Sequence, residues 1–532
     1  MPGKKMGSIC LDTLEKRWRS TCRVIFKEEV GSLSEFVPWL KLYNEPIVQR
    51  KSSLSGKEVT YAISSYKENS KWVSFEEIDF GKRFAPVSLN DVKDIDSLVE
   101  ALADRFYYTG NVILGNSGYV EKSSNISDSF YMYDTGKLTD SKYVAYSTLG
   151  RLDEDCFGCN GIGESQHCIK CHETFKDKRC FELWMGQYCS DCYYVHQLNN
   201  CSDCLFCFNL KNKRHAVGNL ELGKEKYAAV KTKLLADLAE TLKKEKRLPT
   251  LMDIVAKSKY EKPKFSLAAS APKKTDMAVI ESAFGRTMQL LVGRQTGGKI
   301  DDYQAWLRRN VRKNEQCSSA LSGKPVHRWD YASYFHLPKD RLITYEESQA
   351  FGEQVKMSES EASETTLANA HEKIGRIAFF TSEYVDGTNS NLIEVATSSD
   401  TVNAYRCSPI VYSKFCAYSF WPRSTEHAFG CGALLSSEFC INCYHSVKLR
   451  RCFEMDSCRD CSDSYFCHNC ENVSDCMFCF NAKNLKYAIG NVEVGREKFM
   501  QVKKMVLEEI ARRLEKERGI PQDIYSIGAG KK

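Results

Sequence analysis

Closely spaced cysteine pairs are the residues of this chain that could do chemistry. The pattern Cys-x-x-Cys recurs in two sets of four: Cys156, Cys159, Cys168 and Cys171, then Cys189, Cys192, Cys201 and Cys204. Four thiolates at this spacing are a common ligand set for a structural zinc ion. The same spacing also suits disulfides, or free thiols packed as small apolar side chains. These eight cysteines are therefore candidate metal ligands, zinc is the possible cofactor, and all three states stay open.

A period of three residues must position these cysteines. The ten cysteines in residues 156–207 and the twelve in residues 407–479, of 25 in the chain, lie multiples of three apart within each stretch. Neither a helix of period 3.6 nor a strand of period 2 explains this spacing. The dominant step is twelve, and one column of positions holds small residues only: Ser117, Ser129, Ser141, Cys156, Cys168, Cys180, Cys192, Cys204 and Ala216. This predicts a β-solenoid with 12-residue coils and small side chains inside.

The whole pattern recurs 272 residues later. CSDCLFCFNLKNKRHAVGN at 201–219 matches VSDCMFCFNAKNLKYAIGN at 473–491. The second copy keeps only three of the first four candidate ligands, because Ala428 replaces the first. Free exchange of cysteine with small residues favours packing over metal binding.

The fold class predicted from this duplication is α+β with repeats, in two tandem copies. Each copy consists of a small α/β segment, a 12-residue-coil β-solenoid and an amphipathic helix. The predicted ranges are 1–106 (α/β segment), 107–221 (Cys-rich solenoid), 222–258 (capping helices), 259–280 (linker), 281–378 (second α/β segment), 379–493 (second solenoid) and 494–532 (capping helix and tail).

Within the first copy, residues 21–26 (TCRVIF) read as a strand and residues 33–43 as a helix. The capping helix has an apolar face built from Val230, Leu234 and neighbouring leucines. Outward positions beside the small column form an aromatic stripe that includes Phe181 and, in the second copy, Phe453. Such a stripe must be covered by the other copy, by the α/β segment or by an external partner. We expect the stripes of the two copies to pack on each other about a pseudo-twofold axis, or to pair in a homodimer.

Charge and hydropathy narrow the class of protein. The 532 residues carry 75 basic and 69 acidic side chains, a net charge of +6. This mild excess of positive charge does not indicate a histone-like polymer binder, but basic runs could contact an anionic partner. The candidate partner-binding residues are Lys243, Lys244, Arg512 and Arg513. No apolar run is long enough for a membrane span, so we predict a cytoplasmic protein with no membrane partner and mostly reduced thiols.

The segment LSGKEVTYAISSYKENSKWVSFEEIDFGKRF, the cysteine-rich repeats and the motif SDCLFCFNLKNKRHAVGN together resemble cysteine-rich repeat proteins of uncultivated bacteria and archaea. The resemblance covers roughly residues 50–227 and, more weakly, 317–499. It implies the repeat architecture and a zinc-binding character, and it implies no activity. Those proteins commonly carry a further Cys-x-x-Cys ribbon near the N-terminus, where this chain has only Cys10 and Cys22.

Three classes of function remain open. The preferred one is a non-catalytic interaction scaffold that bridges or caps a large ribonucleoprotein such as the ribosome, because repeat proteins expose long faces to partners. The second is a protein that binds RNA directly through basic helices and tyrosines. The third is a zinc- or thiol-dependent enzyme, which would need an exposed cysteine of low pKa. His172, His196, His445 and His468 are off the inward phase and are expected at the surface.

Overall fold

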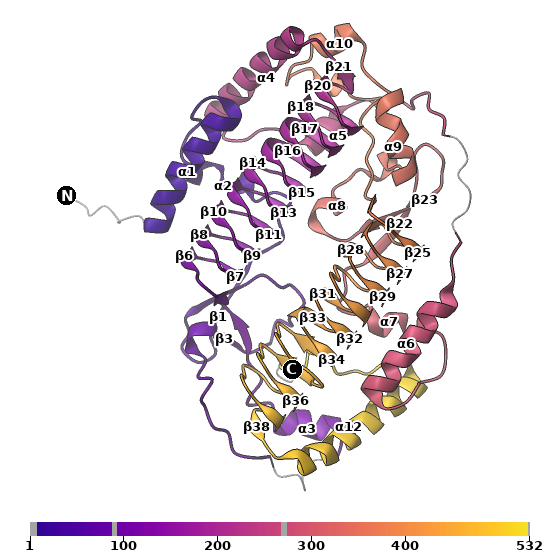
Figure 1. Cartoon of the computed structure of the whole chain (residues 1–532). Coiled ribbons are helices and arrows are strands. Elements are labelled where there is room, and N and C mark those ends of the chain that lie inside the picture. Colours follow the sequence, from indigo (N-terminus) through magenta and orange to yellow (C-terminus); the bar gives the residue numbers. More distant parts are fainter. Residues whose placement is uncertain (1–7, 88–92, 268–273, 530–532) are drawn as a thin grey trace, which may run out of the picture.

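The computed structural model describes residues 8–87, 93–267 and 274–529, so residues 268–273 of the predicted linker lie outside it. Most strands belong to two large sheets, one from each half of the chain (Figure 1). The first sheet has 17 strands: β5 (Ile113–Leu114), β6 (Gly118–Glu121), β7 (Ser124–Ser127), β8 (Phe130–Tyr133), β9 (Gly136–Thr139), β10 (Lys142–Ala145), β11 (Thr148–Arg151), β12 (Glu154–Phe157), β13 (Asn160–Gly163), β14 (Gln166–Ile169), β15 (His172–Phe175), β16 (Lys178–Gln187), β17 (Ser190–Asn199), β18 (Ser202–Leu205), β19 (Phe208–Lys211), β20 (Arg214–Val217) and β21 (Leu220–Glu221). The second has 12: β25 (Ser390–Ile393), β27 (Val402–Tyr405), β29 (Lys414–Ala417), β30 (Glu426–Phe429), β31 (Gly432–Leu435), β32 (Glu438–Ile441), β33 (Tyr444–Val447), β34 (Arg450–Asp456), β35 (Tyr465–His468), β36 (Ser474–Met477), β37 (Lys486–Ile489) and β38 (Val492–Glu493).

Nearly all strand pairs in these sheets are parallel, with partners 12 residues apart. Cys156 pairs with Cys168, for example, and Cys440 with Cys452. The chain enters the left-handed region at every third residue, as at Leu149 (φ 56°). That conformation costs about 1–2 kcal/mol for a residue with a side chain. The ladder hydrogen bonds and the buried interior must offset this cost along both sheets.

The predicted fold class is wrong. It required two matching β-solenoids, each with its own α/β segment and amphipathic helix. The structure instead has a mixed 17-stranded sheet in one half and a large, mostly parallel 12-stranded sheet in the other, with the three-stranded sheet β24 (Tyr384–Asp386), β26 (Thr397–Ser399) and β28 (Ile410–Val411) beside it. Pro422 cannot donate a ladder hydrogen bond, and the pairs beside it, Phe420↔Gly432 and Arg423↔Leu435, are isolated bridges.

Helices and short strands surround the two sheets. The helices are α1 (Ile9–Phe26), α2 (Val37–Leu40), α3 (Ile95–Ala101), α4 (Lys224–Glu245), α5 (Leu251–Lys257), α6 (Met277–Val292), α7 (Gln304–Leu307), α8 (Ala332–Phe335), α9 (Tyr345–Gln354), α10 (Glu359–Ser363), α11 (Ala370–Lys373) and α12 (Arg496–Glu517), with 3-10 turns at Leu33–Phe36, Phe75–Glu77, Ile300–Tyr303 and Lys339–Arg341. The two-stranded sheets are β1 (Val48–Lys51) with β2 (Glu58–Tyr61), β3 (Trp72–Ser74) with β4 (Tyr108–Gly110), and β22 (Asn314–Ser318) with β23 (Pro325–Trp329).

The predicted strand at residues 21–26 is the last part of α1. Its buried residues Cys10, Leu14, Trp18, Cys22 and Ile25 follow the helical period, and the Ser8 side chain caps the first turn. The helix lies along the first sheet, and α6 takes the same place on the second (Figure 1). Of residues 21–26, Thr21, Cys22, Ile25 and Phe26 are buried, and they continue the apolar face of this helix.

Each half also contributes a segment that packs against the sheet of the other half. In Figure 1, α3 lies beside α12 at the end of the second sheet, and α9 and α10 lie near the end of the first. The Ile95 backbone N–H donates to Glu509 Oε2 over 2.8 Å. In the other direction, the Met357 N–H donates to the Gly218 carbonyl over 2.9 Å. The two halves are thus interlocked rather than joined only through the linker.

Candidate functional site

The structure brings each predicted set of four cysteines together inside the first sheet. Cys156 and Cys168 are paired on adjacent strands, as are Cys192 and Cys204. All eight sulfurs lie within donor distance of the carbonyl oxygen two residues earlier, as for Cys168 Sγ and Gln166 O at 3.6 Å. Across residues 8–87, 93–267 and 274–529, no group of three or more His, Cys, Asp or Glu side chains is placed to hold a metal ion. Zinc at these cysteines stays a prediction.

The repeat cysteines are also poorly placed for thiol chemistry. Every one of the 22 is at most 2% exposed. Burial raises the pKa of the Cys407 thiol to about 12, and it also raises the pKa of Cys416. Not every repeat thiol is shifted the same way: burial acts to raise the pKa of Cys159 too, but contacts from the Cys156 and Cys171 thiols outweigh it and lower the pKa to about 5. Solvent does not reach any of these sulfurs, so none is open to a substrate. Outside the repeats, Cys317 is partly exposed, and burial raises the pKa of its thiol as well.

Helices of the same half cover the predicted aromatic stripes. Phe181 contacts Phe26 of α1, with ring centroids 5.3 Å apart, and it also contacts Trp39 of α2. In the second half, Phe453 contacts Trp306 of α7 at 5.9 Å. The expectation that the two stripes pack on each other is therefore wrong. The cover comes from the α/β segment of each half, which was the other expected cover and which includes the helix misread as a strand at residues 21–26.

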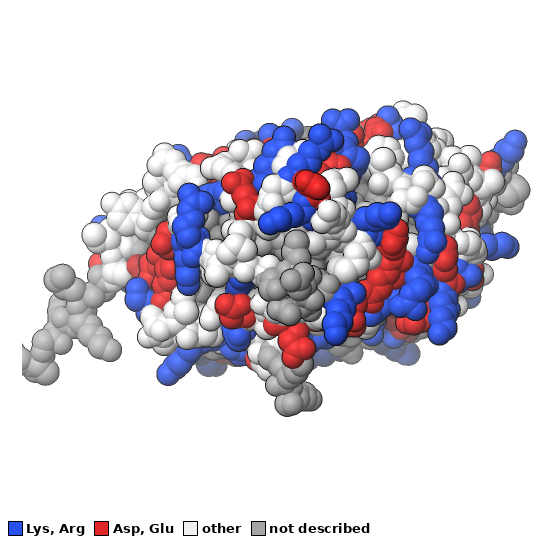
Figure 2. All heavy atoms as spheres, turned by 90° about the horizontal axis from the view of Figure 1, so that it is seen from below, with Lys and Arg blue, Asp and Glu red and all other residues white. Residues whose placement is uncertain are grey.

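The four candidate partner-binding residues lie on two different helices and are not equivalent. Lys243 and Lys244 are exposed near the end of α4, and Lys243 forms an ion pair with Glu28. Arg512 is exposed on α12, whereas Arg513 is only 15% exposed and pairs with Asp96 and Glu509. Figure 2 shows the face on the α12 side, where Lys and Arg are interspersed with Asp and Glu. Lys244 and Arg512 are the two of the four with no ion pair recorded within the described residues.

Several buried polar contacts join the two halves. His196 Nε2, in the first sheet, lies 3.1 Å from both the backbone nitrogen and the carbonyl oxygen of Thr381. His468 Nε2, in the second sheet, accepts the Thr109 N–H over 3.1 Å. Both pairs are related by the 272-residue offset, so each half receives the same contact from the other. Asn209 and Asn481 repeat the exchange: each donates over 2.8 Å to a backbone carbonyl of the other half.

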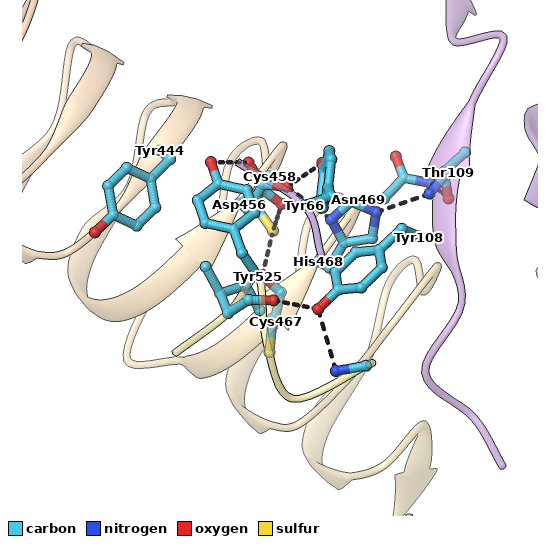
Figure 3. A network of polar contacts seen from close by, with 12 residues as sticks. Tyr66, Tyr108, Thr109, Tyr444, Asp456, Cys458, Cys467, His468, Asn469 and Tyr525 are labelled. Atoms are coloured by element: carbon cyan, nitrogen blue, oxygen red, sulfur yellow. Dashed lines mark hydrogen bonds and ion pairs between the residues drawn. The ribbon is translucent and has the colours of Figure 1, made fainter. Parts of the chain in front are cut away.

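Around His468, this contact extends into a buried network centred on Asp456 (Figure 3). Asp456 Oδ2 accepts hydrogen bonds from Tyr66 Oη over 2.6 Å and from His468 Nδ1 over 2.8 Å. Asp456 Oδ1 accepts one from Tyr525 Oη over 3.1 Å. Burial acts to raise the pKa of the Asp456 carboxyl, but the contacts from His468 and Tyr66 outweigh it and hold the pKa below its ordinary value. The carboxylate is therefore charged and fully paired inside the protein.

The Asp456–His468 pair resembles part of a hydrolase triad, but its free end is occupied. A general base needs an open Nε2 that faces a nucleophile or a substrate. Here Nε2 accepts the Thr109 amide, and the imidazole is 1% exposed. The arrangement can lock two segments together, and it leaves no place for a reacting atom.

The sequence reasoning placed His172, His196 and His468 at the surface, and this was wrong. Their exposed fractions are 0%, 0% and 1%. Burial lowers the pKa of His196 to about 3. A signal was present, because His196 and Thr109 recur as His468 and Thr381 at the offset of the duplication. The sequence pattern does not show that each histidine contacts the threonine of the other copy.

Comparisons with known proteins give no match that shows a family. No family model matches it, and no curated protein does. Among solved structures, a putative acetyltransferase from Desulfovibrio desulfuricans G20 is 8% identical and has a TM-score of 0.11, over 88% of this chain and 77% of that one. A likeness at that level carries no argument about fold or activity. In the described part of the chain, no helix is both long and apolar enough to cross a membrane.

Proposed function

We propose that this protein is a non-catalytic interaction scaffold that binds a large ribonucleoprotein, such as the ribosome, at two separated places. The observation that carries the proposal is the interlock between the halves. Thr109 on His468 and Thr381 on His196 hold the two sheets in one arrangement. Sites on the two halves are then fixed relative to each other, and linked sites gain affinity through effective concentration.

The helices α4 and α12 are the surfaces that this scaffold would present. They lie at opposite ends of the molecule in Figure 1. Helix α4 carries six lysines against four acidic residues, and α12 carries seven basic residues against five. Each helix thus has a modest positive excess, as expected for salt-sensitive contacts with phosphate backbones.

Co-sedimentation with ribosomes, using charge reversal at the unpaired positions, tests the proposal. Lys244→Glu with Arg512→Glu should weaken co-sedimentation at low salt and leave the melting temperature unchanged, because both side chains are exposed and neither forms an ion pair with another described residue. The matched control is Lys51→Glu with Lys142→Glu, which changes the net charge equally at exposed strand residues outside the two helices.

If the control pair weakens binding as much as the test pair, only net charge matters and the two-helix surface is wrong. If the parent protein does not co-sediment at any salt concentration, the ribonucleoprotein partner is wrong. Mass spectrometry of a native pull-down would then show whether a protein partner takes its place.

A further inference from the structure

A cavity lies between the two halves, and no part of the proposed scaffold function uses it. Its volume is about 320 Å³, and its walls come from residues 45–67, 137–149, 309–331 and 420–445. The cavity therefore exists only because the halves are interlocked. Small-molecule sites have volumes of roughly 300–1,000 Å³, and this cavity is at the lower end of that range. A cavity of this volume is too small to hold a polymer strand.

The lining of this cavity is mainly cationic. Five basic side chains contribute to it, namely Lys67, Lys137, Arg309, Arg312 and Lys313, against the two carboxylates of Glu45 and Asp330. The His445 ring is also in the wall, and burial together with nearby Lys137 lowers its pKa to about 4, so it is neutral at physiological pH. The walls thus carry three more positive than negative charges.

Ion pairs within the protein neutralise only part of this excess. Glu45, whose side chain is 6% exposed, receives two cations: Lys137 at 3.1 Å on one oxygen and Arg312 on the other. Arg309 is paired with Glu454, which lies outside the lining. Because one carboxylate is shared by two cations, the cavity wall keeps a net positive charge. The wall is partly desolvated, so this charge attracts an anion more strongly than it would in water.

We propose that this cavity binds a small phosphate-bearing anion. Arg312 can present parallel N–H donors to a tetrahedral oxyanion, and lysine binds phosphate as a point charge. Lys67 and Lys313 are exposed at the rim, where they can close over the ligand without losing an ion pair recorded among the described residues. Glu45 is paired with Lys137 and Arg312, so it competes with the ligand for these two cations.

Isothermal titration calorimetry and thermal-shift measurements test this site with inorganic phosphate, pyrophosphate and glucose 6-phosphate, and with citrate as a carboxylate anion. Lys313→Gln should weaken binding of the best phosphate compound at least about tenfold, because one charge-assisted contact is lost. Glu45→Gln should act in the opposite direction and strengthen binding, because it frees two cations. Lys142→Gln removes an exposed lysine outside the cavity and should leave binding unchanged.

The three phosphate probes separate free phosphate from phosphorylated metabolites. If Glu45→Gln is less stable without ligand, its thermal shift is measured against its own ligand-free melting temperature. The proposal is overturned if no phosphate compound binds at millimolar concentration, if citrate binds as tightly as the best of them, or if Lys313→Gln binds like the parent. These outcomes do not depend on ribosome binding, so this site and the scaffold proposal can fail separately.

Discussion

Acid should destabilise this protein through His196, and replacing this residue should remove a defined part of the effect. Its imidazole is fully buried and lies against the Thr381 backbone of the other half. Burial lowers its pKa from 6.5 to about 3. Because the folded-state pKa is depressed, the unfolded chain takes up a proton before the folded one does. The stabilisation is therefore complete above pH 6.5 and is lost as the pH falls toward 3.

The size of the effect follows from these two values. At pH 5 the unfolded imidazole is almost fully protonated, while the folded one is still neutral. The linkage relation then gives a loss of about 2 kcal/mol between pH 7 and pH 5 from this one group. The loss at pH 5 depends only on the unfolded pKa, since the folded ring stays neutral at any pH above about 4.

The variant His196→Gln isolates this contribution. A glutamine amide has both a donor and an acceptor, so it can replace whichever hydrogen bond the ring nitrogen makes with the Thr381 backbone, but it does not titrate. Urea unfolding at pH 7 and pH 5 should show the variant losing about 2 kcal/mol less than the parent. Other buried histidines, such as His172, titrate equally in both proteins and cancel from the comparison. The matched control is His371→Gln, whose side chain is 35% exposed.

Two results would refute the reasoning. If the parent and His196→Gln lose the same stability between pH 7 and pH 5, His196 is not a buried neutral group. If His371→Gln flattens the pH dependence as much as His196→Gln does, burial is not the cause. Lower stability of the variant at pH 7 alone would decide nothing, because only the difference between the two pH values is compared.

Two further predictions concern the buried polar network and the cysteines. Asp456→Asn should lower the free energy of unfolding by about 3 kcal/mol, because three buried donors lose a charged acceptor. The control Asp460→Asn, at a side chain that is 43% exposed, should change the free energy of unfolding little. Equal losses in the two variants would contradict the stabilising role of the network. Chelation under reducing conditions should leave the melting temperature unchanged, because all eight candidate ligand thiols already lie within hydrogen-bond distance of carbonyls; a clear decrease, with zinc found by metal analysis, would favour the metal reading.

The period of three identified buried positions better than it identified the fold. It marked the repeat cysteines as one environment, and all of them are buried. The step of twelve is the register of the parallel pairs. It could not show that the ladder of the second half breaks into isolated bridges near Pro422, or that the two sheets differ in strand number. Isolated bridges also occur away from the proline, as at Val447↔Arg459 and Arg459↔Glu471.

The strand predicted at residues 21–26 was wrong because too few neighbouring residues were considered. Residues 21–26 look like a strand alone, but Leu14 and Trp18 extend the same apolar face over a helix. The misread strand also removed from the prediction one of the helices that cover the aromatic stripe, since Phe26 of α1 contacts Phe181. The histidines were misplaced for a related reason. An outward phase means exposure only if nothing packs on that face, and the segment that packs on His196 lies 185 residues away in the sequence.

The contacts between the two halves, rather than the cysteines, are the features of this structure that bear on function. Chemistry-bearing residue types are concentrated in the repeats, yet they face an interior that solvent does not reach. Two of the positions that differ between the halves lie where the halves meet: Asp456 stands where the first half has Trp184, and His445 where it has Glu173. Each half packs a segment against the sheet of the other half, so the duplicated sequence forms two junctions, and these differ in their residues. One junction is the closed, fully paired network around Asp456, and the other is the cationic cavity that contains His445. Selective chemistry in this protein is therefore expected where the copies diverge, and the repeated interior supplies the rigid frame.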